Sequence, residues 1–204
     1  MDLKNKRILI TAGPTWVPID TVRVISNIAT GATGILLAER FVRQGAKVTL
    51  LLGPAEDCRV NKTINLKRFR FYAELKEKAV KEVRSGSYDV IIHSAAVSDF
   101  TPIKRRRVKI TSKKPLNIRL VPLPKIVDIM RRVAPRAKLV MFKLEPGISD
   151  NALVKRAKEA QEKAGADMVI ANKIEPYRAF IIYEKGIISV KSKRALAYNL
   201  INLL

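Results

Sequence analysis

Residues 7–34 decide the fold, and they read R-I-L-I-T-A-G-P-T-W-V-P-I-D-T-V-R-V-I-S-N-I-A-T-G-A-T-G. Residues 8–12 are mostly apolar and partly β-branched, and they stop at a Gly-Pro pair, which is typical of a buried strand. The segment from Thr33 to Gln44 carries apolar residues at helical spacing. We therefore predict a strand and a helix that are separated by an unusually long insertion, residues 13–30.

Strands and helices alternate along the rest of the chain. Apolar runs predict further strands at 48–52, 68–71, 89–93, 138–142 and 167–171, and helices at 73–84, 125–133, 150–164 and 193–204. This alternation is typical of a parallel sheet with helices on both faces. We predict an α/β fold, a Rossmann-like three-layer parallel sheet, in a single nucleotide-binding domain that spans residues 1–204.

Two segments depart from this alternation. Residues 100–123 hold a basic run at 104–107 and two candidate short strands, 108–111 and 117–121, which we interpret as an excursion that forms a flap or a dimer arm. Residues 180–190 predict a C-terminal hairpin around Glu184-Lys185-Gly186.

The composition excludes several classes of protein. Hydrophobic residues make up 48% of the 204 residues, which argues against disorder. The apolar runs are far shorter than the ~20 residues of a membrane span, and the N-terminus lacks the apolar core of a signal peptide. Cys58 is the sole cysteine, so no intramolecular disulfide can form. We therefore expect a cytoplasmic protein with no membrane association.

The chain is strongly basic. Lys and Arg number 40 against 18 Asp and Glu, a formal net charge of +22. This balance favours an anionic partner such as phosphorylated metabolites, nucleic acid or an acidic membrane face. The alternative is a set of solvated helix faces with no particular partner.

Small residues flank the long insertion at both ends. Gly13 and Thr15 begin it, and Thr30 and Gly31 end it, with Gly34 close behind. Glycines at a helix N-terminus let backbone amides approach an anion, so two such turns could hold a triphosphate. The alternative is that these residues are small for packing. A dinucleotide fingerprint would place its glycines directly after the strand, which disfavours a nicotinamide-dependent reductase.

The insertion resembles the opening of the phosphopantothenate–cysteine ligase family, also called phosphopantothenoylcysteine synthetase. The matching residues are Ile10–Thr15, Pro18–Asp20, Val22-Arg23, Ile25–Asn27 and Thr30-Gly31, at the spacing of the family. Further matching blocks lie at 94–100, 109–110, 124–127, 142–145 and 169–172. The resemblance covers nearly the whole chain.

This resemblance implies an activity and its requirements. Members join phosphopantothenate to cysteine in coenzyme A biosynthesis, through an acyl-nucleotidylate made from ATP or CTP with Mg²⁺. It also implies a homodimer, with the excursion at 100–123 as the candidate arm. Bacterial members are often fused to a flavin-dependent decarboxylase, so we expect either a separate decarboxylase chain or that this sequence is a domain excised from such a fusion.

The resemblance also assigns roles to residues. Asn27 and Lys109 would be catalytic, and Arg23, Ala95 and Ala96 would bind the substrate. The nucleotide would be bound by Gly13, Thr15, Thr30, Gly31, Thr33, Gly34, Asp99, Lys109, Pro124, Lys125, Ile126, Val127, Phe142 and Lys163. The metal ligands stay unassigned.

Several of these roles have alternatives. Lys113 or Lys114 could take the place of Lys109, Arg23 could form a surface salt bridge, and Phe142 could be a core aromatic. His93, the sole histidine, is expected to be packed inside a strand.

The chain departs from the bacterial pattern of the family at three positions. Ala32, Ala160 and Ala164 stand where bacterial members carry lysines, so the choice between ATP and CTP stays open. The two alternative functions are a basic nucleic-acid-binding module and an NADP-dependent reductase on the same fold. The basic run favours the first, although aromatic residues for base stacking make up only 6% of the chain.

Overall fold

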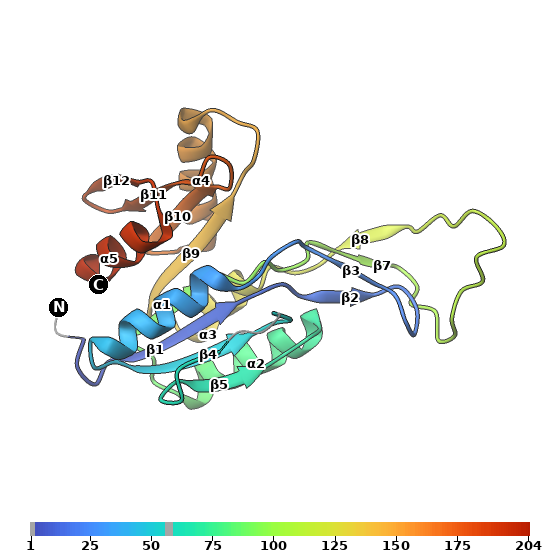
Figure 1. Ribbon diagram of the computed structural model, residues 1–204, viewed down its shortest axis with the longest axis horizontal. Coiled ribbons are helices and arrows are strands. Elements are labelled where there is room, and N and C mark those ends of the chain that lie inside the picture. The colour runs from blue at the N-terminus through green and yellow to red at the C-terminus, as the bar shows by residue number, and fades with distance from the viewer. Residues whose placement is uncertain (1–2, 56–58) are drawn as a thin grey trace.

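The computed structural model describes residues 3–55 and 59–204, and its centre is an eight-stranded sheet (Figure 1). The strand order is β12-β11-β10-β9-β6-β1-β4-β5. The strands are β1 (Arg7–Ala12), β4 (Lys47–Leu52), β5 (Asn65–Arg68), β6 (Val90–His93), β9 (Lys138–Leu144), β10 (Met168–Lys173), β11 (Arg178–Tyr183) and β12 (Gly186–Val190). Neighbouring strands pair in parallel along the run β10-β9-β6-β1-β4-β5, whereas β11 pairs antiparallel with both β10 and β12. Cys58 lies outside the described residues.

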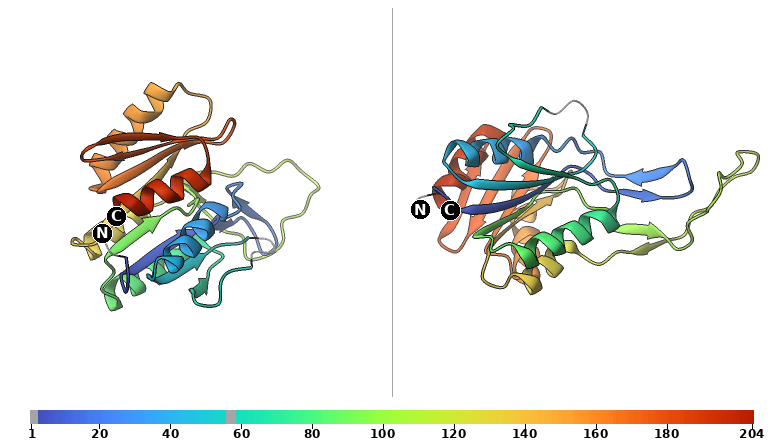
Figure 2. Two further views of the ribbon diagram at one scale, coloured as in Figure 1. Left: turned by 60° about the vertical axis from the view of Figure 1, so that its left-hand side comes forward. Right: turned by 90° about the horizontal axis from the view of Figure 1, so that it is seen from below.

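Five helices cover the two faces of the sheet. On one face lie α1 (Ala32–Arg43) and α5 (Lys193–Leu203), and on the other lie α2 (Tyr72–Ser85), α3 (Ile126–Val133) and α4 (Asp150–Ala164) (Figure 2). The layers follow from the alternation of side chains along each strand. In β1, Ile8 and Ile10 join the core under α1, while Leu9 joins the core under α2 and α3. The predicted three-layer Rossmann-like fold is confirmed.

The order of the strands places a topological switch point, called the crevice below, at the carboxyl ends of β1 and β6 near the centre of the sheet. From β1 the chain moves outward to β4 and β5, then crosses to β6 on the other side of β1 and continues to β9 and β10. The connections after β1 and β6 therefore diverge at the carboxyl ends of these two neighbouring strands. Ligands of open α/β sheets bind at such a switch point.

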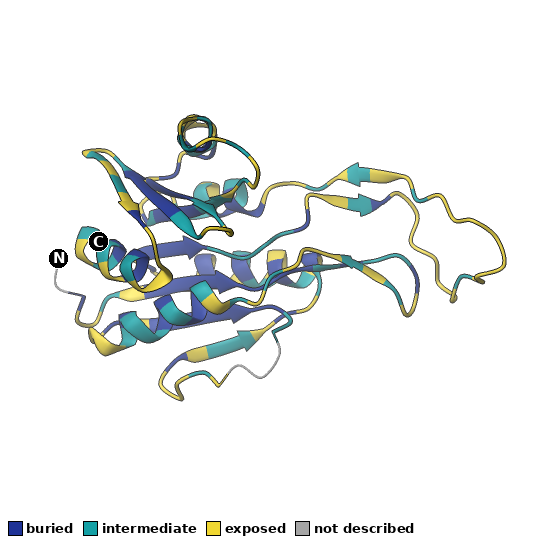
Figure 3. Ribbon diagram, turned by 45° about the horizontal axis from the view of Figure 1, so that its top comes forward, coloured by how far each residue is buried: buried dark blue, intermediate teal, exposed yellow. Residues whose placement is uncertain are grey.

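Two hairpins leave the sheet at this crevice. The β2–β3 arm, residues 16–26, pairs β2 (Trp16–Pro18) with β3 (Val24–Ser26), and the β7–β8 arm, residues 100–122, pairs β7 (Phe100–Pro102) with β8 (Leu120–Pro122). The arms follow β1 and β6, contact each other, and extend from the body of the molecule (Figure 1). Their residues are mostly exposed or half-buried, unlike the strands of the central sheet (Figure 3).

The structure corrects the predicted strands in three places. The third strand lies at Asn65–Arg68 and not at 68–71, because Phe69 is buried beside Gly53 and Phe71 begins α2 as its N-cap. Residues 108–111 form no strand, since the Ile110 N–H donates to a side-chain carboxylate. The second strand of the excursion is shifted, from 117–121 to Leu120–Pro122.

The predicted helices agree with the structure within one or two residues. Ser149 caps α4, and its hydroxyl accepts from the Ala152 N–H at 3.2 Å. Within the residues that the structure describes, no helix has the length and apolar character needed to cross a bilayer.

Candidate nucleotide and substrate site

Glycines bring α1 against the carboxyl end of β1. A Cβ atom added at Gly34 would lie 2.4 Å from the Ala12 Cβ, and one added at Gly31 would lie 3.2 Å from the Gly13 nitrogen. Gly13 and Gly31 also have positive φ angles of 79° and 74°, which other residues rarely adopt. These positions therefore require glycine for close packing, and that packing sets where the N-terminus of α1 points.

The N-terminus of α1 is open to an anion. Its N-cap is Gly31, which has no side chain to satisfy the first amides, and its first turn contains no acidic residue. Thr30 accepts a long hydrogen bond, 3.4 Å, from the Ala32 N–H, and Thr33 is half-buried in the first turn. Free amides together with the helix dipole favour a phosphate at this place.

The loops after β1 and β6 are joined beyond the ends of the strands. The Ala96 N–H donates to the Gly13 oxygen at 2.9 Å, and the Thr15 N–H donates to the Ala96 oxygen at 3.3 Å. The buried Thr15 hydroxyl accepts from the Ser98 N–H at 2.9 Å and lies 3.1 Å from the Ser98 hydroxyl. This bonding holds Ala95 and Ala96 beside the crevice, and Ser98 is a contributor that the sequence analysis missed.

Asn27 lies at the base of the β2–β3 arm and faces the loop after β6. Its side-chain amide donates to the oxygens of Ala96 and Val97 at 3.2 and 3.1 Å. Asn27 itself is exposed, so a ligand in the crevice can compete for this amide. Its neighbour Ile28 is fully exposed, at 102% relative accessibility.

Arg23 is held by a buried carboxylate that sequence analysis did not assign. The Arg23 guanidinium donates to Asp20 at 2.6 Å and to the Ile110 oxygen at 3.1 Å. The Asp20 side chain is buried, and its pKa is held far below the usual range, chiefly by the hydrogen bond from the Val22 N–H, although burial opposes this shift. Arg23 thus forms a salt bridge, as the alternative expected, but its partner is buried, and 40% of the Arg23 side chain stays exposed.

The start of α3 brings further predicted residues to the same edge of the sheet. Lys125 forms an ion pair with Asp99, and both side chains are more than half exposed. The Pro124 oxygen accepts from the Tyr72 hydroxyl at 2.6 Å, which fixes this turn against α2. Ile126 and Val127 are buried in the core under α3, so their side chains anchor this turn to the core.

Phe142 is half-buried on β9 and packs against the core under α1 and α5. Next to it, Lys143 pairs with Glu145 at 3.0 Å, and Arg156 pairs with the same carboxylate at 3.2 Å. The carboxyl end of β9 is therefore polar and carries fixed charges.

The predicted lysines lie in different places. Lys109, Lys113 and Lys114 are all exposed in the loop between β7 and β8. This loop extends away from the central sheet (Figure 1). Lys163 lies in the last turn of α4, which leads into the start of β10, so it is at the opposite edge of the sheet. The structure thus does not bring Lys163 together with the glycines.

His93 is packed as expected. It is buried at the end of β6, its Nδ1 lies 2.8 Å from the Thr11 hydroxyl, and burial lowers its pKa to about 4. The imidazole is therefore neutral near pH 7. Across residues 3–55 and 59–204, no three His, Cys, Asp or Glu side chains cluster in a way that could hold a metal ion.

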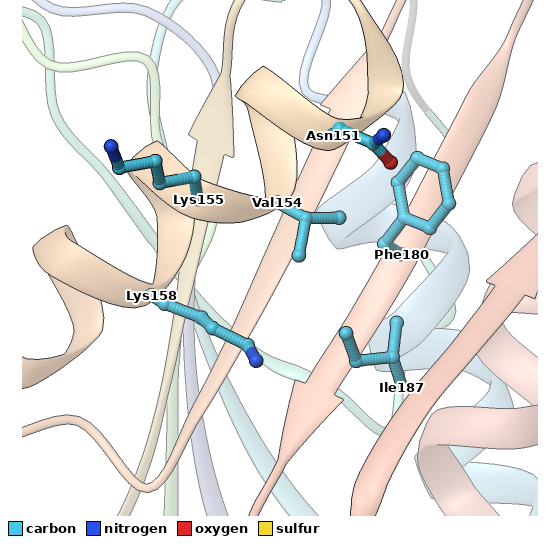
Figure 4. A pocket seen from close by; sticks show the side chains of 6 residues that line it. All are labelled: Asn151, Val154, Lys155, Lys158, Phe180 and Ile187. Carbon is cyan, nitrogen blue, oxygen red and sulfur yellow. The ribbon is translucent and has the colours of Figure 1, made fainter.

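A separate groove of about 490 Å³ lies between α4 and the β11–β12 hairpin (Figure 4). It is lined by Asn151, Val154, Lys155, Lys158, Phe180 and Ile187. None of these side chains belongs to the crevice at β1 and β6, where only some of the predicted residues lie.

The strand order and the glycine-packed helix start together define an α/β domain of the Rossmann-like class. The chain belongs to the family described as the DNA/pantothenate metabolism flavoprotein C-terminal domain, which it matches over residues 3–202. The family resemblance found in the sequence is therefore confirmed.

Similar curated proteins are bifunctional coenzyme A biosynthesis proteins named CoaBC. The protein from Thermococcus kodakarensis is 37% identical over 176 residues, which cover 86% of this chain and 43% of the relative. The protein from Methanocaldococcus jannaschii is 33% identical over 178 residues, which cover 85% and 42%. The chain spans about half the length of the curated relatives it matches.

Solved structures share the fold along nearly the whole chain. The DNA/pantothenate metabolism flavoprotein from Streptococcus pneumoniae has a TM-score of 0.87 and 26% identity, with 97% of each chain covered. The C-terminal domain of a CoaBC protein has a TM-score of 0.83 and 25% identity, with 99% of this chain and 95% of that chain covered.

Proposed function

We propose that residues 1–204 form a single ligase domain that joins phosphopantothenate to cysteine with ATP or CTP, within coenzyme A biosynthesis. The observation that carries this proposal is the place of Asn27, whose amide is held at the crevice between the α1 N-terminus and the loop after β6. The family, and the relatives named as coenzyme A biosynthesis proteins, support it.

In the first half-reaction, the carboxylate of phosphopantothenate attacks the α-phosphorus of the nucleotide, and pyrophosphate leaves. An anion must approach a polyanion, so donors have to neutralise both. The amides of Gly31 to Gly34 and the Thr30 and Thr33 hydroxyls would hold the phosphates. Arg23, with its guanidinium partly exposed, would bind the phosphate of the other substrate.

In the second half-reaction, the amine of cysteine attacks the acyl carbon, and the nucleoside monophosphate leaves. Negative charge grows on the acyl oxygen during this attack. The Asn27 amide, which donates to the oxygens of Ala96 and Val97 in the free protein, would turn to donate to this oxygen. Ala95 and Ala96 are small, so the intermediate can approach their backbone.

The remaining predicted residues would surround the nucleotide. Gly13, Thr15, Pro124 and Lys125 border the crevice, with Phe142 nearby on β9. Mg²⁺ usually keeps several waters and is bound through phosphates and one or two carboxylates, a mode that needs no cluster of acids. Asp99 would supply such a carboxylate, and the metal would neutralise phosphate charge when bound.

The arms explain how Lys109 could act. Lys109 lies in the loop between β7 and β8, which extends away from the central sheet, so Lys109 would complete the site of a second chain in a homodimer. Exposed apolar side chains on the β7–β8 arm favour such an interface, namely Phe100 (51%), Ile103 (54%) and Leu120 (41%). Light scattering should give the mass of a dimer, and a monomer would contradict this part of the proposal. The expected cytoplasmic location stays a prediction.

The experiment is a pyrophosphate-release assay with phosphopantothenate, cysteine and Mg²⁺, run with CTP and ATP side by side. We expect release with at least one nucleotide, and only when phosphopantothenate is present. No release with either nucleotide would contradict the proposed function.

A further inference from the structure

Asp20 is a buried carboxylate whose two oxygens are both fully used. Its Oδ1 accepts from the N–H groups of Val22 and Arg23, each at 2.8 Å. Its Oδ2 accepts from the Arg23 guanidinium at 2.6 Å and from the Ile110 N–H at 3.1 Å. The residue is only 2% exposed. Four donors converge on one carboxylate, although it lies in an arm that is otherwise largely exposed.

These bonds tie the two arms together. Asp20, Val22 and Arg23 belong to the β2–β3 arm, whereas Ile110 lies in the loop of the β7–β8 arm, 90 residues further along the chain. The Arg23 guanidinium also donates to the Ile110 oxygen at 3.1 Å, so both backbone groups of Ile110 are held. One more bond, from the Arg106 N–H to the Ile19 oxygen at 3.0 Å, joins the same two segments.

The two arms are strongly basic. In the sequence, Asp20 is the sole acidic residue of residues 16–26 and 100–122. The same two segments carry nine cations, namely Arg23, Lys104, Arg105, Arg106, Arg107, Lys109, Lys113, Lys114 and Arg119. Like charges repel, so a loop this basic would spread away from Arg23 unless an anion held it. Asp20 provides that anion, and its carboxyl stays ionised because its pKa is low.

We propose that Asp20 is a positioning residue for the ligation, one that orients the Arg23 guanidinium and places the loop that carries Lys109. This inference rests on the proposed function. Asp20 touches neither substrate nor nucleotide, because its oxygens are occupied and buried. It acts through Ile110, the neighbour of Lys109, and through Arg23.

The first test replaces Asp20 by Asn in the full chain. The side chain keeps its size, but its charge is lost and an NH₂ group must face donors where an oxygen accepted. We expect faster amide hydrogen exchange at Ile110 and a decrease in kcat/KM for the nucleotide of about 10- to 100-fold, the range for losing a hydrogen bond to a charged group.

A matched control is Asp89→Asn. Asp89 also accepts from a backbone N–H, that of Arg7 at 2.8 Å, and pairs with Lys6, but it lies just before β6, at the opposite end of that strand from the crevice. Asp89→Asn should leave the amide hydrogen exchange rate of Ile110 and the kcat/KM for the nucleotide unchanged. Should Asp20→Asn fail to fold, Ile110→Pro removes the same bridge from the other side, because proline has no N–H. It should show the same decrease.

A double-mutant cycle separates positioning from a general structural role. If Asp20 acts through Lys109, then Asp20→Asn should cost much less in a Lys109→Ala background than in the wild type. Equal losses in both backgrounds would overturn the link to Lys109, as would a kcat/KM that Asp20→Asn leaves unchanged. If the wild-type protein releases no pyrophosphate, the proposed function fails. The exchange rate at Ile110 still decides in that case whether Asp20 holds the arms together, and an unaltered rate would overturn it.

Discussion

The Asn27 side-chain amide lies 3.2 Å from the Ala96 oxygen, and this bond joins segments that are 69 residues apart in the sequence. It ties the base of the β2–β3 arm to the loop after β6, across the switch point of the sheet. The amide is thus held on the protein in the free state and is exposed enough to be reached by a ligand. This arrangement suits a group that exchanges one acceptor for another during the reaction.

Asn27→Asp should stop the reaction between its two halves. A carboxylate cannot donate a hydrogen bond, and it would repel the oxyanion that forms when cysteine attacks. We expect turnover to fall by about 100-fold or more, the usual cost of losing an oxyanion donor, while an acyl-nucleotide accumulates. Mass spectrometry of the quenched reaction would detect this intermediate.

The control for this variant is Asn199→Asp. Asn199 also donates to a backbone carbonyl, that of Ala195 at 2.9 Å, but within α5 and far from the crevice. It should leave turnover within about twofold of the wild type, as surface changes usually do. Full turnover in Asn27→Asp would remove Asn27 from the mechanism.

Alanine variants of the three arm lysines should separate their roles. The N–H and the oxygen of Ile110 are both bonded to the β2–β3 arm. These bonds fix the backbone next to Lys109. We expect Lys109→Ala to lower kcat/KM for the nucleotide by about 100-fold, and Lys113→Ala and Lys114→Ala by less than about tenfold. Steady-state kinetics with varied nucleotide measures this. A larger loss at Lys113 or Lys114 would move the role to that residue.

Gly34→Ala should disturb the start of α1. Alanine is the better helix former, but its Cβ would lie 2.4 Å from the Ala12 Cβ and 2.8 Å from the Ser94 hydroxyl. We expect the steric effect to dominate, with a loss of about 1–3 kcal/mol in the free energy of unfolding and weaker nucleotide binding. Urea denaturation and calorimetric titration measure the two effects.

Gly186→Ala serves as the control, because no atom lies within 4 Å of the added Cβ, although the backbone there is strained. It should leave nucleotide affinity unchanged. If Gly34→Ala binds the nucleotide as tightly as the wild type does, the start of α1 does not contact the nucleotide.

The free energy of unfolding should decrease at acidic pH because of His93. Burial lowers the pKa of His93 to about 4, whereas the unfolded chain titrates near 6.5. Between these values the unfolded state binds a proton that the folded state does not, so the free energy of unfolding decreases as the pH drops from about 6.5 to about 4. The loss amounts to at most about 3 kcal/mol. Urea unfolding at several pH values measures it.

His93→Gln should flatten the pH dependence within this window, because glutamine does not titrate. The downward pKa shifts of Asp89, Glu145 and Asp150 also reduce stability in acid, but at lower pH, and both proteins share them. The same slope in both proteins would contradict the assignment to His93.

Much of the fold could be predicted because the pattern of side chains reflects burial. Residues 8–12 are buried on both faces, and the helices show one apolar side, so the period of the pattern identified each element. The strands of the two arms could not be predicted in this way. Each has only three residues, too few to show a period, and they are paired outside the main sheet. Alternation misled at 68–71, where Phe69 lies in the connection after β5 and Phe71 is the N-cap of α2.

The site was predictable only where the family motif named residues. Motif and spacing indicated Asn27, Arg23 and the glycines. The structure places Asn27 and the glycines at the carboxyl ends of β1 and β6, and it places Arg23 further out in the β2–β3 arm, where it is bonded to Ile110. Asp20 lies inside the motif, yet no pattern could show that its carboxylate meets the Ile110 N–H, 90 residues away. Lys163 was assigned by alignment alone, and its distance from the crevice follows from the direction in which α4 runs.

The arms begin and end at the crevice, while the apolar cores lie almost entirely within the sheet and its helices. Val17 is the arm residue that enters these cores among the buried residues of the described chain. Selection can therefore alter loop length, charge and partner contacts in the arms without unfolding the scaffold. If the proposed function holds, a change of nucleotide preference or of dimer partner would then need few compensating substitutions elsewhere, so the arms are the segments in which substrate specificity could evolve, or be engineered, most readily.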